Sequence, residues 1–193
     1  SVGGSTFSNI TGVSAGTNII NSAAQNLTVT SCNSTGGAVK FVVADVNTTG
    51  TVGLTVTNNT VNGGGVLLRG LDCAIRNTPN FLGLISGNNI TGCQGEGIQM
   101  SVRGTSNARL RFTGNRTLGN QFNTGVNIFD VSGTPSIGAI FTNNTSDRFI
   151  LTQTVGTFRV EQLGQFNGAS GNAGILAVSG TVVDVAAGSL GIP

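Results

Sequence analysis

Apolar and polar residues alternate in short runs along the chain, and each run ends in a turn rich in Asn, Thr and Gly. Four such runs are LTVTNNT (54–60), LISGNNIT (84–91), LRFTGNRT (110–117) and AIFTNNT (139–145). Their apolar anchors, 29, 27 and 29 residues apart, are Val56, Ile85, Phe112 and Phe141. Alternation over so few positions predicts short strands that bury one face.

A second set of strand-like runs follows the Asn turns: AVKFVVAD (38–45), GVLLRGLD (65–72), GIQMSVRG (97–104) and GVNIFDVSG (125–133). Their leading residues, 27, 32 and 28 residues apart, are Val39, Val66, Ile98 and Val126. Two strand sets with nearly the same period predict a solenoid, because a repeat of this length buries its apolar face only by stacking on its neighbours.

The Asn and Gly residues of the turns suit tight bends, because both tolerate a positive φ and the Asn amide bonds its own backbone. The same Asn on successive coils also predicts a ladder of stacked side-chain amides. We therefore interpret the repeated GNN and TNN motifs as architecture rather than as a catalytic or binding site.

The run I-S-G-N-N-I-T-G-(x)4-G-I-x-M-x-V-x-G at 85–104 resembles a coil of the right-handed parallel β-helix, the pectate-lyase-like solenoid. Pectin-degrading enzymes, phage tailspikes and bacterial autotransporter passengers share that architecture. The resemblance covers roughly residues 5–165 and implies an all-β fold, a right-handed parallel β-helix. With about 28 residues in each repeat, the 193 residues predict about seven coils. We expect one domain, 1–193, with regular coils over 1–165, apolar C-terminal strands over 166–193 and no obvious caps.

Composition favours an extracellular structural protein. Only 8% of the 193 residues are charged and 31 are Gly, whereas the surface of a free soluble domain is about a quarter or more charged. The net charge of +2 comes from scattered Arg and Lys residues, which argues against nucleic acid as a partner. No apolar run is long enough to span a bilayer, so we expect no membrane insertion.

Catalysis is not expected, because the chain has no His, the commonest general base, and only seven carboxylates. The repeat places Asp45 over Asp72 on the next coil, at about 4.8 Å. Such a pair is a candidate Ca²⁺ site or an acid/base pair, although Arg103 is close enough in register to neutralise it. A polysaccharide lyase or hydrolase remains an alternative, despite the absence of Trp and Tyr.

The three cysteines, Cys32, Cys73 and Cys93, have no metal-binding spacing and there is no His to join them. They are either buried as small apolar residues or include one disulfide. Phe112 and Phe141 occupy equivalent anchors and should stack in the solenoid interior.

Sequons of the form N-x-[ST] are frequent, and most lie on the repeated Asn turn, where an Asn ladder beside Thr-rich strands generates them automatically. If the chain is glycosylated, the candidate sites are Asn9, Asn26, Asn33, Asn47, Asn58, Asn89, Asn115, Asn143 and Asn144.

The ends of the repeat suggest self-assembly. The segment AGILAVSGTVVDVAAGSLGIP (173–193) is strand-like and strongly apolar, and a head-to-tail contact that does not close yields a filament. The expected joint residues are Ile175, Leu176, Val178, Val182, Val183 and Val185. We therefore expect a subunit of a cell-surface filament whose partner is another copy of itself. The alternative is an adhesin or autotransporter-like passenger that binds a host or cell-surface receptor.

Overall fold

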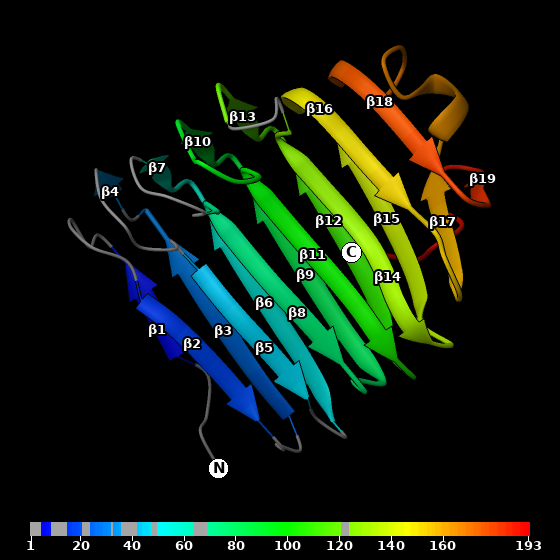
Figure 1. The fold of residues 1–193 in the computed structure, drawn as a ribbon, viewed down its shortest axis with the longest axis horizontal. Helices are drawn as coiled ribbons and strands as arrows, with labels where there is room; N and C mark the ends of the chain where they lie inside the picture. Colours follow the sequence, from blue (N-terminus) through cyan, green and yellow to red (C-terminus); the bar gives the residue numbers. More distant parts are fainter. Residues whose placement is uncertain are drawn as a thin grey trace.

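The chain is a parallel β-solenoid, in which the strands of successive turns stack side by side into long sheets (Figure 1). The computed structural model describes residues 5–8, 15–20, 24–31, 33–35, 42–47, 50–63, 69–120 and 124–193. Every strand pair found in these residues is parallel, as expected when each strand repeats the one in the turn before it. The predicted all-β solenoid is confirmed.

One flank of the solenoid is an eight-stranded sheet to which each turn contributes one strand. In spatial order its strands are β1 (Ser5–Ser8), β3 (Ala24–Thr30), β6 (Thr51–Thr57), β9 (Asn80–Ser86), β12 (Asn107–Thr113), β15 (Ser136–Thr142), β17 (Thr157–Glu161) and β19 (Val182–Val185). In Figure 1 this sheet lies behind the second one.

The second flank and a short third side together form an eleven-stranded sheet. The second flank contains β2 (Ala15–Ile20), β5 (Val42–Asn47), β8 (Leu71–Arg76), β11 (Ile98–Gly104), β14 (Val126–Gly133), β16 (Thr145–Thr152) and β18 (Ala173–Ser179). The third side contains β4 (Asn33–Thr35), β7 (Thr60–Asn62), β10 (Asn89–Thr91) and β13 (Arg116–Leu118), the last of which pairs with the start of β16. The described residues form about five complete turns, from β3 to β16, with incomplete turns at both ends; the sequence predicted about seven.

The first strand set has the register that the sequence predicted. The anchors pair in the order Phe7, Val29, Val56, Ile85, Phe112 and Phe141. The rings of Phe112 and Phe141 stack with centroids 4.9 Å apart and an interplanar angle of 9°, which confirms the predicted interior stack. On the following strand, β17, Val160 pairs with Ala139 and so does not continue this row.

The second strand set was assigned too early in the chain at two turns. Ile98 does pair with Val126, but on its other side it pairs with Leu71, and Leu71 pairs with Val42. The error has a physical cause: residues 38–46 are almost continuously apolar, so the alternation can be read in either phase.

A ladder of buried asparagines runs along the corner between the eight-stranded sheet and the third side. Its members are Asn59, Asn88, Asn115, Asn144 and Asn172. Each of the first four donates Nδ2 to Oδ1 of the next at 2.9 Å, and its backbone N–H donates to the same oxygen. Nδ2 of each also donates to a strand carbonyl of the preceding turn, as from Asn115 to Ile85 at 2.8 Å.

The residue before each ladder asparagine has a positive φ. These residues are Asn58, Gly87, Gly114, Asn143 and Gly171, and their φ angles lie between 55° and 67°. The left-handed conformation turns the chain sharply so that the next amide points inward. Only Gly and Asn adopt it here, which explains why the repeated motif is GN or NN.

After β19 the chain runs back over the outer face of the eight-stranded sheet; we call residues 186–193 the C-terminal strap. Glu161 accepts hydrogen bonds from the backbone N–H groups of Gly188 and Leu190, both at 2.9 Å. Arg111 donates to the carbonyl of Ile192 at 2.6 Å, and the Ile192 side chain is buried. In Figure 1 the strap lies behind the front sheet and brings the C-terminus to the middle of the solenoid.

Candidate functional site

The two strands of the last turn leave one end of the solenoid open. β18 pairs only with β16, and β19 pairs only with β17, among the residues that the structure describes. Each therefore presents a free backbone edge in the direction of the solenoid axis. β1 and β2 are the edge strands at the opposite end of the two sheets.

The inward-facing residues of this last turn continue the rows of the core. Leu176 pairs with buried Phe149, Val178 with buried Leu151, and Val182 with buried Phe158. Leu176 and Val182 pack against the core, but Val178 is 44% exposed because no further turn covers it.

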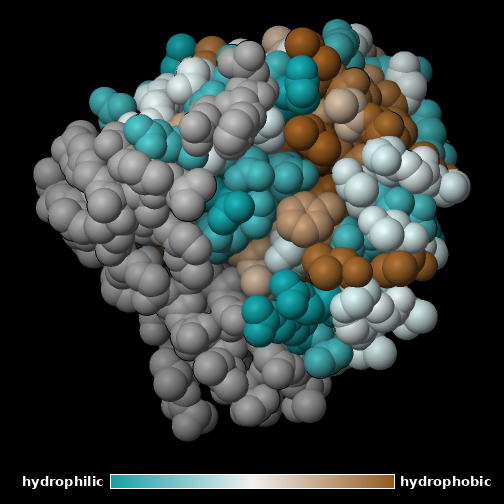
Figure 2. All heavy atoms as spheres, in the orientation of Figure 1, coloured by the Kyte–Doolittle hydropathy of each residue, from teal (hydrophilic) through white to brown (hydrophobic). Residues whose placement is uncertain are grey.

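The outward-facing residues of the last turn are also apolar. Ile175 is 59% exposed and pairs with Arg148, and Val183 is 45% exposed and pairs with Arg159. Val185 is partly buried beside Glu161. Figure 2 shows hydrophobic residues gathered at the end of the molecule that carries β16 and β18. All six predicted joint residues thus lie on the two edge strands.

Part of this end is closed by the loop that follows β17. The loop contains a short 3₁₀ turn (Leu163–Gln165) and places Phe166 against Phe141 and Phe149, at centroid distances of 5.4 and 4.9 Å. Asp184 accepts hydrogen bonds from the backbone N–H groups of Leu163 and Gly164 and so ties the loop to β19. This partial cap was not predicted from the sequence; it covers one corner and leaves both strand edges free.

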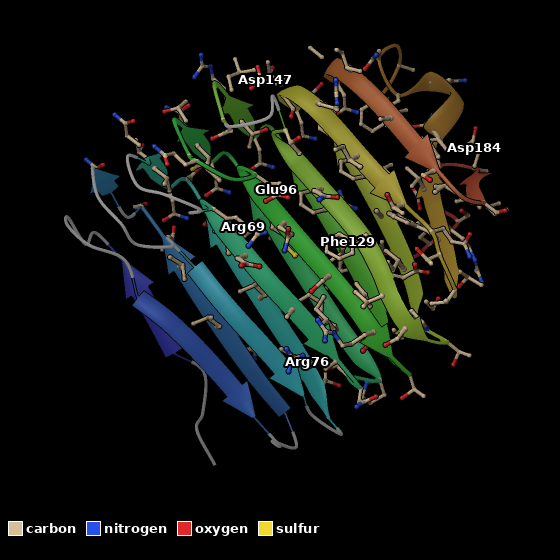
Figure 3. All side chains as sticks on the ribbon, in the orientation of Figure 1. Arg69, Arg76, Glu96, Phe129, Asp147 and Asp184 are labelled. Atoms are coloured by element: carbon tan, nitrogen blue, oxygen red, sulfur yellow. The ribbon has the colours of Figure 1, made fainter. Side chains whose placement is uncertain are left out.

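A second polar site lies on the outer face of the eleven-stranded sheet. Arg69 bridges two turns: its Nε donates to Glu96 at 2.6 Å and its Nη1 to Asp72 at 3.1 Å. Gln99 and Asn127 donate to the same two carboxylates, at 3.5 and 3.3 Å. Figure 3 shows Arg69 and Glu96 pointing toward each other, with Phe129 on the same face.

The ion pair shifts the pKa of both partners toward the charged state. Burial by itself would raise the pKa of Glu96, but hydrogen bonds from its own backbone and from Arg69, with the charge of Arg69, outweigh it and lower the pKa. Burial would likewise lower the pKa of Arg69, but Glu96 and Asp72 outweigh it and raise the pKa. This cluster was not predicted from the sequence, where its signal is an Arg and a Glu 27 residues apart.

The predicted stacking of Asp45 on Asp72 is wrong. The register pairs Asp45 with Ala74 and Asp72 with Val43, so the two carboxylates are offset by two residues. In the described residues no group of three or more His, Cys, Asp or Glu side chains is placed to hold a metal ion. Arg69, rather than the predicted Arg103, is the cation that neutralises Asp72.

The remaining described carboxylates accept hydrogen bonds from backbone N–H groups of loops. Asp130 binds the amides of Val155 and Gly156 at 3.1 and 2.8 Å, and Asp147 binds that of Gly119 at 2.7 Å. With Glu161 and Asp184, which hold the strap and the loop after β17, four acidic residues fix connecting segments in place.

Two of the predicted sequons are incompatible with modification of the folded chain. The amides of Asn115 and Asn144 are buried in the ladder and donate both to the next asparagine and to a strand carbonyl. Exposed sequons are Asn26, Asn33, Asn58, Asn89 and Asn143, and their glycosylation stays a prediction. Asn9 lies outside the described residues, and Asn47 is described only by its backbone in β5.

Cys73 and Cys93 are buried in the core, in agreement with one of the two expected states, that of small apolar residues; Cys32 lies outside the described residues. Burial raises the pKa of Cys93 to about 11.

The chain matches no family model, no curated protein and no solved structure. Within the described ranges no helix is long and apolar enough to cross a membrane. The class of protein is therefore defined by the fold alone, a parallel β-solenoid.

Proposed function

We propose that this protein is an extracellular structural subunit that polymerises head to tail, by adding the first turn of one copy to the last turn of the next. The proposal rests on the open end of the solenoid. There β18 and β19 each have one unpaired backbone edge, and Val178 continues a row of core residues but is not covered by a further turn. The matching partners are β2 and β1 of another copy, the edge strands at the other end of the same two sheets. Stacking in this way would continue both sheets without a change of strand direction.

The composition of the edge strands supports this joint. Soluble proteins usually protect an exposed edge with Lys, Pro or a bulge. β18 has the sequence AGILAVS and β19 the sequence VVDV, so neither contains Lys or Pro. The strap runs from β19 along the outer face of the eight-stranded sheet and does not cross the open end. The edges of β18 and β19 therefore stay accessible.

The proposed role is structural rather than catalytic. Six of the seven carboxylates have described side chains, and each of these six has a donor partner from Arg69 or from a backbone amide. Hydrogen bonds of this kind are typical of carboxylates that hold chain segments in place. The low charged content of 8% suits a subunit whose ends are buried in a polymer.

Electron microscopy and sedimentation velocity over rising concentration test the proposal. We expect uniform fibres with an axial repeat of roughly 35–40 Å, from eight strands at about 4.8 Å each. Val178→Lys places a charge in the uncovered row and should leave monomers. Val131→Lys is the matched control, because Val131 is 40% exposed but lies on β14, away from the end; it should still form fibres.

Wild-type protein that stays monomeric at high concentration would contradict the proposal and would favour an adhesin. Fibres that persist in Val178→Lys would show that the copies associate through another surface.

A further inference from the structure

A hollow on the outer face of the eight-stranded sheet lies between two arginines. The register pairs Arg109 of β12 with Gly138 of β15, and Gly138 with Arg159 of β17. Gly138 has no side chain, so a gap separates the two guanidinium-bearing strands at this level. The outward positions of the three residues follow from their buried chain neighbours Ala108, Ile137 and Phe158.

The strap completes the walls of this hollow. The cavity, of about 300 Å³, is lined by Asn107, Arg109, Ser136, Ile137, Gly138, Arg159, Ser189 and Leu190. The Leu190 methyl groups lie 3.4 and 3.5 Å from where a Cβ of Gly138 would be, so this residue packs over part of the floor. Glu161 holds the strap in place through the amides on either side of Ser189.

The charge in the hollow is not balanced by a carboxylate. Among the described residues neither Arg109 nor Arg159 forms an ion pair, and no acidic residue lines the cavity. Arg109 donates Nη2 to Asn80 at 2.8 Å, but its Nε is buried without an acceptor. The neighbouring Glu161 uses one carboxylate oxygen for Gly188 and the other for Leu190.

The polar lining adds further donors. Ser136 Oγ accepts a hydrogen bond from Thr157 Oγ1 at 3.2 Å, so its own hydrogen is free to donate. Ser189 and Asn107, whose side chains also carry hydrogen-bond donors, line the same cavity. Donor-bearing residues therefore come from three strands, β12, β15 and β17, and from the strap.

We propose that this hollow binds a tetrahedral oxyanion, a phosphate or sulfate group. Guanidinium groups form strong bidentate hydrogen bonds with such groups. Donors that approach from several walls match an acceptor with oxygens in several directions better than a planar carboxylate. Because Ser189 and Leu190 belong to the strap, the bound anion also fastens the strap to β12, β15 and β17. The site is separate from the open end and does not depend on the polymer.

Isothermal titration calorimetry of the full chain tests the proposal, with inorganic phosphate and inorganic sulfate as probes against sodium chloride at matched ionic strength. We expect saturable binding of one anion per chain. Arg159→Gln, at an exposed position that should not disturb folding, should weaken binding at least tenfold, and Arg109→Gln should do the same. Arg116→Gln is the control, because Arg116 is exposed on the third side and bonds Asn89.

A sulfated heparin disaccharide and its desulfated form distinguish the source of the anion. Binding of the inorganic ions alone supports a free anion, and tighter binding of the sulfated disaccharide supports an ester on a polysaccharide. Failure of every anionic probe to bind, or binding that Arg159→Gln and Arg116→Gln weaken equally, would overturn the proposal. A variant that no longer forms fibres but still binds the anion would bear on the proposed polymerisation and not on the anion site.

Discussion

The side-chain amide of Asn88 donates to Oδ1 of Asn115 at 2.9 Å, and the same oxygen accepts the backbone N–H of Asn88 at 3.1 Å. One carboxamide therefore satisfies two donors of the turn before it. Asn88 and Asn115 are both buried, so water does not reach their polar groups. The ladder therefore supplies the hydrogen bonds that these buried groups need at the corner.

Asn115→Ala should destabilise the fold by about 2–4 kcal/mol, since it leaves buried donors and a carbonyl of the adjoining turns without partners. The measurement is the urea midpoint by circular dichroism. Asn89→Ala is the matched control, because Asn89 is exposed and its side chain accepts a hydrogen bond from Arg116 at the surface; it should change stability by less than about 0.5 kcal/mol. Equal effects of the two changes would mean that the ladder adds nothing to stability.

The turn position before each ladder residue offers a test of conformation alone. Gly114 has φ +61° and no atom lies within 4 Å of where its Cβ would be. Gly114→Ala should therefore cost roughly 1 kcal/mol through the left-handed backbone and not through a clash. Gly114→Asn should cost less, because Asn58 and Asn143 hold the same position at φ 56° and 55°. The thermal midpoints of the two variants give the order of their stabilities. A larger decrease for Gly114→Asn than for Gly114→Ala would contradict the prediction.

The Arg69–Glu96 ion pair predicts acid lability. The pKa of Glu96 is lower in the folded chain than its ordinary value of 4.5, so its stabilising effect is present above that pH and is lost as the pH falls. Both side chains are partly exposed, so Glu96→Gln should cost about 1 kcal/mol or less at pH 7. The difference from wild type should shrink as the pH falls below 4.5.

A double-mutant cycle isolates this pair. In the Arg69→Gln background, Glu96→Gln should change the urea midpoint little at any pH. A difference that persists at low pH, or in that background, would mean that Glu96 acts through another partner.

Cys93 predicts lability at high pH. Its pKa is raised from 9.0 to about 11 in the folded chain, so the unfolded thiol ionises first and stability falls as the pH rises between these values. The loss should reach up to about 2 kcal/mol. In a background with Cys32→Ser and Cys73→Ser, the urea midpoint should drop from pH 8.5 to 11, and Cys93→Ser should remove most of that slope. A Cys93 thiol that iodoacetamide alkylates at pH 8 as fast as an unfolded peptide would contradict the burial.

The sequence predicted most of the architecture and little of the surface chemistry. The predicted phase of the first strand set was correct, because anchors such as Val29 and Val56 stand between Thr residues, which indicates the face that is buried. The predicted phase around Val42 was wrong, because apolar residues occur on both faces of this strand and the sequence does not indicate which face is buried. The strap and the hollow over Gly138 had no signal, because they depend on contacts such as Arg111 with Ile192, 81 residues apart.

The strap has a mechanical consequence. It leaves the last strand and lies back across β17, β15 and β12 of earlier turns, held by Glu161 and Arg111. A pull on the C-terminal segment must therefore strip the strap from the outer face before it reaches β19, and only then can the turns unwind one at a time. Under tension, the first event in this solenoid is the detachment of a short clamp, with the stacked turns still intact behind it.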